Sequence, residues 1–228
     1  MKLLICLTAF ATTFAAAFAS AAPVDRPWTH YNKLLEIVKM DKFYAAPPAQ
    51  RDKVVMLGVV HPEDPAMAEK DVVFTIVNGA ERQRIQVNAK GEFIVPFNPA
   101  WVKSDPEVLT TVPAGQKAKF GFNAVPAMPQ STQLDYNSLM GGVPQVNALI
   151  KSQAGMLRFM MPTLIGITLK FPKEAHASVV LGTTRIAADA NGLVKLRLDK
   201  LRLDKALMAA NVPVTLSELP VSTDFLQD

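Results

Sequence analysis

Apolar and polar residues alternate along much of the chain, a period of two that is typical of strands with one buried face. Two longer segments, 53–60 and 163–170, are rich in β-branched and apolar residues. Each is followed by a proline, Pro62 or Pro172, which cannot donate to a central ladder and therefore ends the strand. The same pattern predicts further strands at 71–77, 108–112, 117–125, 177–181 and 214–219.

A four-residue turn signal occurs twice. Residues 88–91 begin with Asn88 and end with Gly91, and residues 189–192 begin with Asp189 and end with Gly192. Asn or Asp can accept hydrogen bonds from the backbone that follows, and Gly tolerates a positive φ. We therefore predict two β-hairpins, which pair 82–87 with 92–97 and 185–188 with 193–198.

Helical spacing of apolar residues is confined to short segments. Tyr31 to Val38 is predicted to be a helix with Thr29 as its N-cap. Asp135 is predicted to cap a matching helix that is interrupted at residues 141–144, before a second helical stretch at 145–153.

Two further helix starts are indicated by a polar residue before the helix. Pro99 follows Asn98 and occupies the first position of a short turn or helix, where its missing N–H costs nothing. Asp199 is predicted to cap a longer helix that reaches about Ala210.

The order of these segments repeats. Four segments return in the same order in the second part of the chain, beginning at Tyr31 and Tyr136, Val54 and Leu164, Arg84 and Arg185, and Leu109 and Leu216. In this alignment His61 corresponds to Phe171. A repeat of this length indicates a duplicated folding unit.

The predicted fold is mainly β, a β-rich α+β fold in tandem duplication. Each unit holds a helix and about five strands in a sandwich-like or open-sheet arrangement. Residues 22–126 form the first unit, 127–132 a linker with polar residues and a proline, and 133–228 the second unit. The alternative is one larger sheet system with a core shared by both copies.

The N-terminal segment is typical of a secretory signal. Lys2 precedes an apolar run over residues 3–18, and Ala19-Ser20-Ala21 offers a cleavage site, so residues 1–21 are predicted to be removed. The alternative is a membrane anchor, because the run is about long enough to span a bilayer. We expect a periplasmic protein. Cys6 lies in this segment, so the mature chain is expected to have no disulfide and no thiolate site.

The composition and the motifs of the sequence argue against several classes of function. The chain has 24 basic and 20 acidic residues, a formal net charge of +4, without a basic stripe of the kind that binds nucleic acid. The motifs of serine hydrolases, nucleotide-binding loops and paired-histidine zinc sites are absent from the sequence. The three histidines do not have metal-ligand spacing, and His61 in 61–64 is interpreted as part of a surface loop. No cofactor, no metal, no nucleic acid and no enzymatic activity are predicted.

The candidate surface for an apolar ligand or a partner is a methionine-rich segment, residues 154–169. Methionine adapts to irregular apolar surfaces and is frequent where binding is tolerant. The alternative is a buried strand preceded by an apolar connection. Two repeated tyrosines are included as candidate contacts, although they could instead pack on the sheet while the following asparagine bonds the backbone. The candidate residues are Met156, Phe159, Met160, Met161, Tyr31 and Tyr136.

Three functional hypotheses follow. The first is an exported envelope protein of non-enzymatic type that binds a partner protein or an envelope component through its two β-rich repeats. The second is a periplasmic carrier or sensor of an apolar, lipid-like ligand that uses the methionine-rich segment and the groove between repeats. The third is a hydrolase with an unrecognised site.

Overall fold

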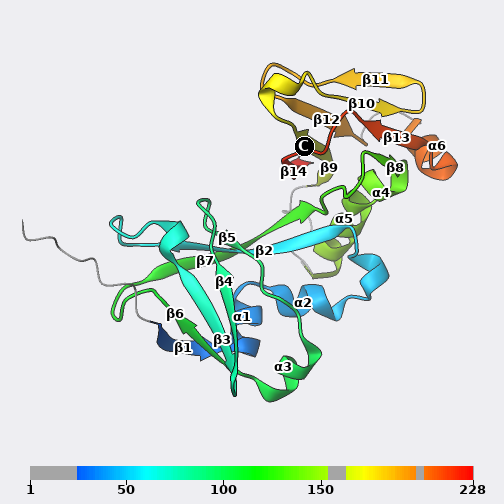
Figure 1. Ribbon diagram of the computed structural model, residues 1–228. Helices are drawn as coiled ribbons and strands as arrows, with labels where there is room; N and C mark the ends of the chain where they lie inside the picture. The colour runs from blue at the N-terminus through cyan, green and yellow to red at the C-terminus, as the bar shows by residue number, and fades with distance from the viewer. Residues whose placement is uncertain (1–24, 154–162, 199–202, 228) are drawn as a thin grey trace, which may run out of the picture.

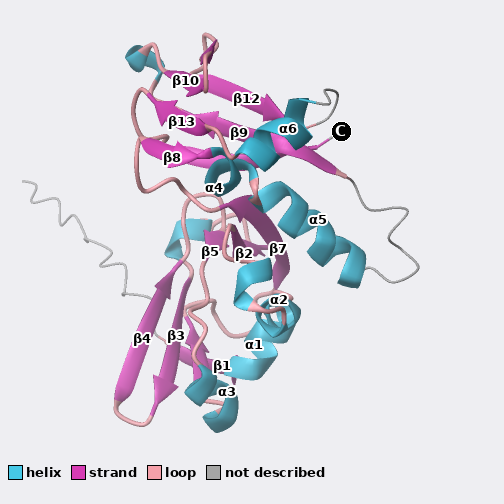
Figure 2. Cartoon of the chain, turned by 90° about the vertical axis from the view of Figure 1, so that its right-hand side faces the viewer, coloured by secondary structure: helices cyan, strands magenta, loops and turns pink. Residues whose placement is uncertain are grey.

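The computed structural model describes residues 25–153, 163–198 and 203–227. Strands predominate and pair in antiparallel sheets, which confirms the prediction of a β-rich fold with short helices. The chain forms two halves that lie one above the other (Figure 1), with β1–β7 in the lower half and β8–β14 in the upper half. Figure 2 shows α4 and α5 on the side where the halves meet.

The first half carries seven strands and three α-helices. Its elements are β1 (Arg26–His30), α1 (Tyr31–Ile37), α2 (Met40–Ala45), η1 (Pro48–Gln50), β2 (Val54–Pro62), η2 (Glu69–Asp71), β3 (Val73–Asn78), β4 (Glu81–Gln86), β5 (Glu92–Phe93), α3 (Pro99–Ser104), β6 (Glu107–Thr110) and β7 (Ala118–Pro126).

The described part of the second half has the same number of strands and α-helices. Its elements are β8 (Gln133–Asp135), α4 (Tyr136–Met140), α5 (Gly142–Gln153), β9 (Leu164–Lys170), η4 (Lys173–Ala175), β10 (Ser178–Leu181), β11 (Thr184–Ala187), β12 (Leu193–Arg197), α6 (Leu203–Ala210), β13 (Pro213–Leu216) and β14 (Ser222–Gln227).

The strand order is the same in both halves. A four-stranded sheet β1-β6-β3-β4 in the first half corresponds to β8-β13-β10-β11 in the second. A three-stranded sheet β5-β2-β7 corresponds to β12-β9-β14. In each half, therefore, the chain alternates between two sheets.

The two predicted hairpins are wrong, although the turns themselves form as expected. Asn88 Oδ1 accepts hydrogen bonds from the N–H groups of Lys90 and Glu92 at 2.8 and 3.0 Å. Asp189 Oδ1 accepts the equivalent pair, also at 2.8 and 3.0 Å. However, β4 pairs with β3 while β5 pairs with β2, so the turn carries the chain from one sheet to the other. Turn chemistry is local and does not choose the pairing partner of the strands that flank it.

The hairpins that do form use glycine turns earlier in each half. Asn78 pairs with Glu81 across Gly79, which has a φ of 63°. Leu181 pairs with Thr184 across Gly182, which has a φ of 57°. A glycine at the first central position of a two-residue loop suits the twist of the flanking strands.

The alignment of the two long strands shifts by one residue from the one read in the sequence. Val60 N–H donates to Gly91 O at 2.9 Å, and Phe171 N–H donates to Gly192 O at 2.8 Å. Val60 therefore corresponds to Phe171, and His61 corresponds to Pro172. Both Val60 and Phe171 are buried, and a one-residue slip would turn either side chain to the opposite face. His61 is exposed beside Glu69, with 3.3 Å between Nδ1 and Oε1.

The structure confirms the helix cap predicted at Asp135 and contradicts the one predicted at Thr29. Asp135 accepts from Ser138 N–H at 2.7 Å, as predicted. The helix start at Pro99 is also confirmed, and Asn98 caps it by accepting from Ala100 N–H at 2.9 Å, a cap that was not predicted. The Thr29 cap is wrong, because Thr29 belongs to β1 and His30 stands at the cap without a side-chain hydrogen bond. Asp199 lies outside the described residues.

The core is continuous across the two halves. One cluster of buried side chains includes Tyr31 and Phe74 from the first half and Tyr136 and Phe171 from the second. Where β7 ends, Thr223 Oγ1 of β14 donates to Pro126 O at 2.7 Å. The halves are therefore in direct contact, and the division at residues 127–132 stays a prediction.

The Asp189 turn predicts an effect of acid on stability. Hydrogen bonds from Leu193 N–H and then Asn191 N–H hold the pKa of the Asp189 carboxyl below its usual value. A lowered folded-state pKa contributes stability above the unfolded-state value of about 3.9 and loses it as the pH falls. We expect Asp189→Asn, which keeps both acceptor bonds as Asn88 does, to flatten the decline of the melting temperature between about pH 5 and pH 2.

Glu63→Gln is the control, because Glu63 is exposed and its carboxyl forms no hydrogen bond or ion pair with another described residue. This variant should leave the acid decline unchanged. Identical acid profiles for the native chain and both variants would contradict this account of the turns.

Candidate functional site

The two candidate tyrosines lie in the interior. Tyr31 is 0 % exposed and Tyr136 is 2 % exposed. Tyr31 Oη donates to Pro96 O at 2.7 Å and accepts from Asn98 N–H at 3.1 Å. Burial raises the pKa of Tyr31. Neither ring is available as an exposed contact for a ligand or partner in this structure.

The asparagine after each tyrosine bonds the end of a later helix. Asn32 N–H donates to Asp105 Oδ1 at 2.9 Å, and its Nδ2 donates to Val102 O at 3.0 Å. Asn137 N–H donates to Asn211 Oδ1 at 2.9 Å, and its Nδ2 donates to Met208 O at 3.0 Å. This geometry favours the structural interpretation of the repeated Tyr-Asn pair, in which it fastens α1 to α3 and α4 to α6.

The methionine-rich segment is described only in part. Met156, Phe159, Met160 and Met161 lie outside the described residues. The remainder of the segment forms most of β9, whose Leu164, Ile165, Ile167 and Leu169 are buried. This part of the segment belongs to the core.

The described surface has an apolar groove where the halves meet, between α5 on one side and α2 with η1 on the other. We call it the junction groove. Its volume is about 660 Å³, within the range typical of small-molecule sites. Its lining residues are Lys42, Ala45, Ala46, Ala49, Gln50, Pro144, Gln145, Ala148, Leu149 and Ser152.

The groove exists because small side chains face each other across the junction. Ala45 and Ala49 line one wall, and Pro144 and Ala148 line the other. Positions four apart on a helix share a face, so the α5 residues at 144, 145, 148, 149 and 152 form one stripe. Alanine fills little volume, and the two walls therefore leave open space above Leu149, which is 9 % exposed.

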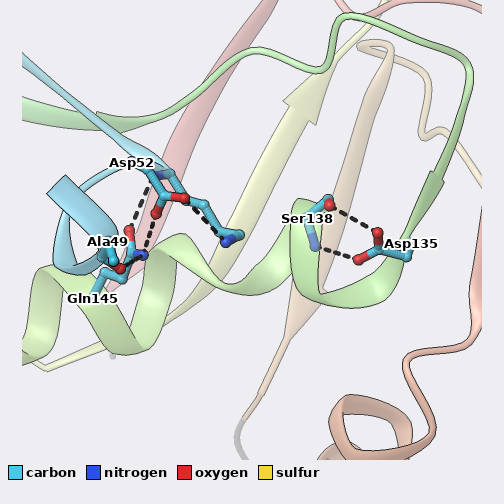
Figure 3. A network of polar contacts seen from close by, with 6 residues as sticks. Ala49, Asp52, Asp135, Ser138 and Gln145 are labelled. Carbon is cyan, nitrogen blue, oxygen red and sulfur yellow. Dashed lines mark hydrogen bonds and ion pairs between the residues drawn. The ribbon is translucent and has the colours of Figure 1, made fainter.

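Gln145 holds the two walls together (Figure 3). Its Oε1 accepts from Lys53 N–H at 3.0 Å, and its Nε2 donates to Ala49 O at 3.1 Å and to Asp52 Oδ1 at 2.5 Å. The last bond is the largest of the effects that hold the pKa of the Asp52 carboxyl below its usual value. One side chain of α5 thus satisfies three groups of the first half.

Gly142 allows the close approach of α5 to the first half. A Cβ on Gly142 would lie 2.7 Å from Lys53 O, a backbone atom that does not yield as a flexible side chain does. A Cβ on Gly141 would first meet Asn137 O of its own half, and next Lys53 Cδ at 2.7 Å. The glycine at 142 is therefore a packing requirement of the junction.

The charge on the walls of the groove is positive. Among its described lining residues Lys42 is the charged one, and the other polar ones are amides and a hydroxyl. The described residues contain no group of three or more His, Cys, Asp or Glu side chains placed to hold a metal ion. Within the same residues, no helix has the length and apolar character needed to cross a membrane.

The sequence predicts a groove between the repeats, but it does not indicate the residues that line this one. Its walls come from segments that are far apart in the chain, and each wall is built from alanines that carry no chemical signature. The signal that was present is the pair Ala45 and Ala49, which are exposed beside Pro47 and Pro48. An exposed alanine indicates a groove only when the residues of the opposite wall are known.

Comparison with known proteins gives one match. Residues 71–171, less than half of the chain, match a family described as a protein of unknown function (DUF2987). The matched span runs from η2 to the residue after β9 and includes α5 with Gln145. No curated protein and no solved structure matches the chain.

Removal of the Gln145 side chain should loosen the junction. We expect Gln145→Ala to lower the free energy of unfolding by about 1–2 kcal/mol, because Lys53 N–H loses its acceptor and two acceptors lose their donor. The pKa of Asp52, followed by NMR, should rise toward its usual value. Gln130→Ala is the control, since Gln130 bonds only the nearby Met128 O. An unchanged Asp52 pKa in Gln145→Ala would contradict the network.

Gly142 tests the close approach independently. Alanine favours a helix over glycine by about 1 kcal/mol, so helix propensity alone predicts that Gly142→Ala stabilises the protein. We expect the opposite, a loss of about 1–2 kcal/mol in urea unfolding, because the new Cβ meets Lys53 O. Gly121→Ala is the control, because its Cβ would lie 4.0 Å from the nearest atom, Val59 Cβ. A stabilised Gly142→Ala variant would overturn the packing argument.

Proposed function

We propose that the protein is an exported, non-enzymatic binding protein of the cell envelope. In this proposal the envelope component that it binds is a single-chain amphiphile with an anionic head, held in the junction groove. The observation that carries the proposal is the apolar groove of about 660 Å³ between α2 with η1 and α5.

The walls suit an apolar chain. Ala45, Ala49, Pro144 and Ala148 present carbon surface, and the described wall residues include no carboxylate. Each methylene that leaves water contributes about 0.8 kcal/mol, so a chain that is half covered by such walls gains useful affinity. The alanine walls leave room for such a chain.

The polar residues of the groove suit an anionic head. Lys42 supplies a positive charge, while Gln50 and Ser152 supply neutral donors. An exposed charge pair contributes about 1 kcal/mol or less. Lys42 therefore selects the sign of the head group, and the apolar walls supply most of the affinity.

The arrangement of the halves supports a duplicated origin, which is part of the proposal. The strand orders match, the two Asx turns match atom for atom, and the Tyr-Asn anchors match. The groove is where the copies differ. The helix that follows the Tyr-Asn helix has 6 residues in the first half, α2, and 12 residues in the second, α5. The extra turns of α5 form one wall of the groove.

The test uses the full chain, produced with residues 1–21 so that native mass spectrometry also reports whether the mature protein begins at Ala22. The probes are dodecanoate and dodecyltrimethylammonium below their micelle concentrations. They have the same chain and opposite charge. We expect the protein to prefer dodecanoate, Ala148→Trp to weaken its binding at least about tenfold, and Lys42→Gln to reduce the preference about threefold.

Ala209→Trp is the matched control. Ala209 is an exposed alanine of α6 and does not line the groove, so this variant should bind dodecanoate as the native protein does. Equal binding by the native protein and Ala148→Trp would overturn the assignment of the groove, as would equal affinity for the two probes.

A further inference from the structure

Strand β4 is a free sheet edge. It lies at the end of the sheet β1-β6-β3-β4, and Glu81, Arg82, Gln83 and Arg84 are all exposed. Across the two-residue turn, Asn78 and Glu81 form the first hydrogen-bonded pair, and bonded and non-bonded pairs alternate from there. The backbone N–H and C=O groups of Arg82, Arg84 and Gln86 therefore point away from β3, toward the edge.

A cavity lies beside this edge. Its volume is about 460 Å³, and residues 83–86 of β4 line one side of it. Leu57, Phe93, Ile94 and Pro96 supply apolar surface on the other side. Ile94 is 55 % exposed and shares this cavity wall with the half-buried Leu57, so the two form an apolar patch. We call the edge and this cavity together the β4 cleft.

The second half shows how the cleft arises. There β12 pairs with β9 over five residues, from Leu193 to Arg197, whereas β5 pairs with β2 only at Glu92 and Phe93. The chain after Phe93 leaves the sheet, and this departure opens the cavity.

The apolar residues of the β4 cleft also have no apolar counterparts at the matching positions of the second half. In the register of the two halves, Ile94 and Pro96 correspond to Lys195 and Arg197, and Leu57 corresponds to Thr168. The second half thus closes the space with strand pairing and carries polar side chains where the first half exposes carbon. The cleft is a specific feature of the first half and not a general property of the unit.

The outward face of the β4 edge carries two positive charges, whereas Glu92 places a carboxylate in the wall of the cavity. Arg82 and Arg84 alternate along β4, so their side chains share one face of the edge. Neither forms an ion pair with another described residue. Charged residues on an edge strand also discourage self-association. Charges alone would only protect the edge from self-association. The apolar cavity beside the two arginines also offers a site for the apolar side chains of a partner.

We infer that the β4 cleft binds an extended peptide segment of a partner protein, which adds to the sheet as a strand next to β4. The backbone of the peptide pairs with Arg82, Arg84 and Gln86, and alternate apolar side chains enter the cavity against Leu57 and Ile94. Two acidic residues, two positions apart on the outward face of the segment, lie opposite Arg82 and Arg84. The side chains that enter the cavity are uncharged, because Glu92 lines its wall. Backbone pairing supplies affinity in this mode, while the pocket and the charges supply selectivity. The inference concerns a surface apart from the junction groove and does not depend on the amphiphile.

The test measures amide hydrogen exchange of the full chain. The probe is a blocked peptide of alternating threonine and leucine in which two successive threonines are replaced by aspartate, so that both acids share the face opposite Arg82 and Arg84. We expect saturating peptide to slow exchange at the amides of Arg82, Arg84 and Gln86 at least about tenfold, because these amides gain hydrogen-bond partners. The same peptide with alternate nitrogens methylated cannot pair along that edge, and it should give no protection.

Two variants test how much the cavity contributes to peptide binding, apart from the strand edge. Ile94→Lys reproduces the residue at the matching position of the second half and should weaken peptide binding at least about tenfold. Lys195→Ile is the matched control and should leave binding unchanged. Both positions are exposed, so folding is retained.

Three outcomes would overturn the inference. The first is unprotected amides at millimolar peptide, and the second is equal protection by the methylated peptide. The third is protection that grows with protein concentration in the absence of peptide, which would assign the edge to a second copy of this chain.

Discussion

The position of α5 against the first half depends on its close approach to the backbone of Lys53. Gly142 makes the approach possible because it carries no Cβ, and Gln145 then satisfies the polar groups that the approach brings together. With α5 fixed in this position, its alanine face lies opposite α2 and η1. The groove is thus a consequence of a contact between one glycine and a carbonyl oxygen.

Local chemistry was predictable from the sequence, and non-local pairing was not. The cap at Asp135 and the turn at Asn88 rest on hydrogen bonds between neighbouring residues, and they were predicted correctly. The hairpins failed because the partner of β5 is β2, some thirty residues earlier, and nothing in the turn specifies it. Strands β1, β8 and β14 were missed because they are short or lie at the margins of the alternating pattern.

The repeat in the sequence indicated which positions share a structural role. It paired Tyr31 with Tyr136 and Asn88 with Asp189, whose contacts are equivalent in the structure. It also placed His61 opposite Phe171, one residue from the observed correspondence. Apolar residues are interchangeable in such an alignment, so only a hydrogen bond such as that of Val60 with Gly91 fixes the register. The candidate surfaces lie where the halves differ, in the length of α5 and in the departure of the chain after Phe93.

The position of β1 has a consequence for the order in which strands can pair during folding. Within its sheet β1 pairs only with β6, and β8 pairs only with β13, toward the other end of each half. Nearly all of a half must therefore be free to fold before the first strand of that half finds its partner. Such distant pairing slows folding and leaves strand edges exposed in the meantime. Because β6 and β13 are the last strands of their four-stranded sheets along the chain, neither sheet can close before its final strand arrives.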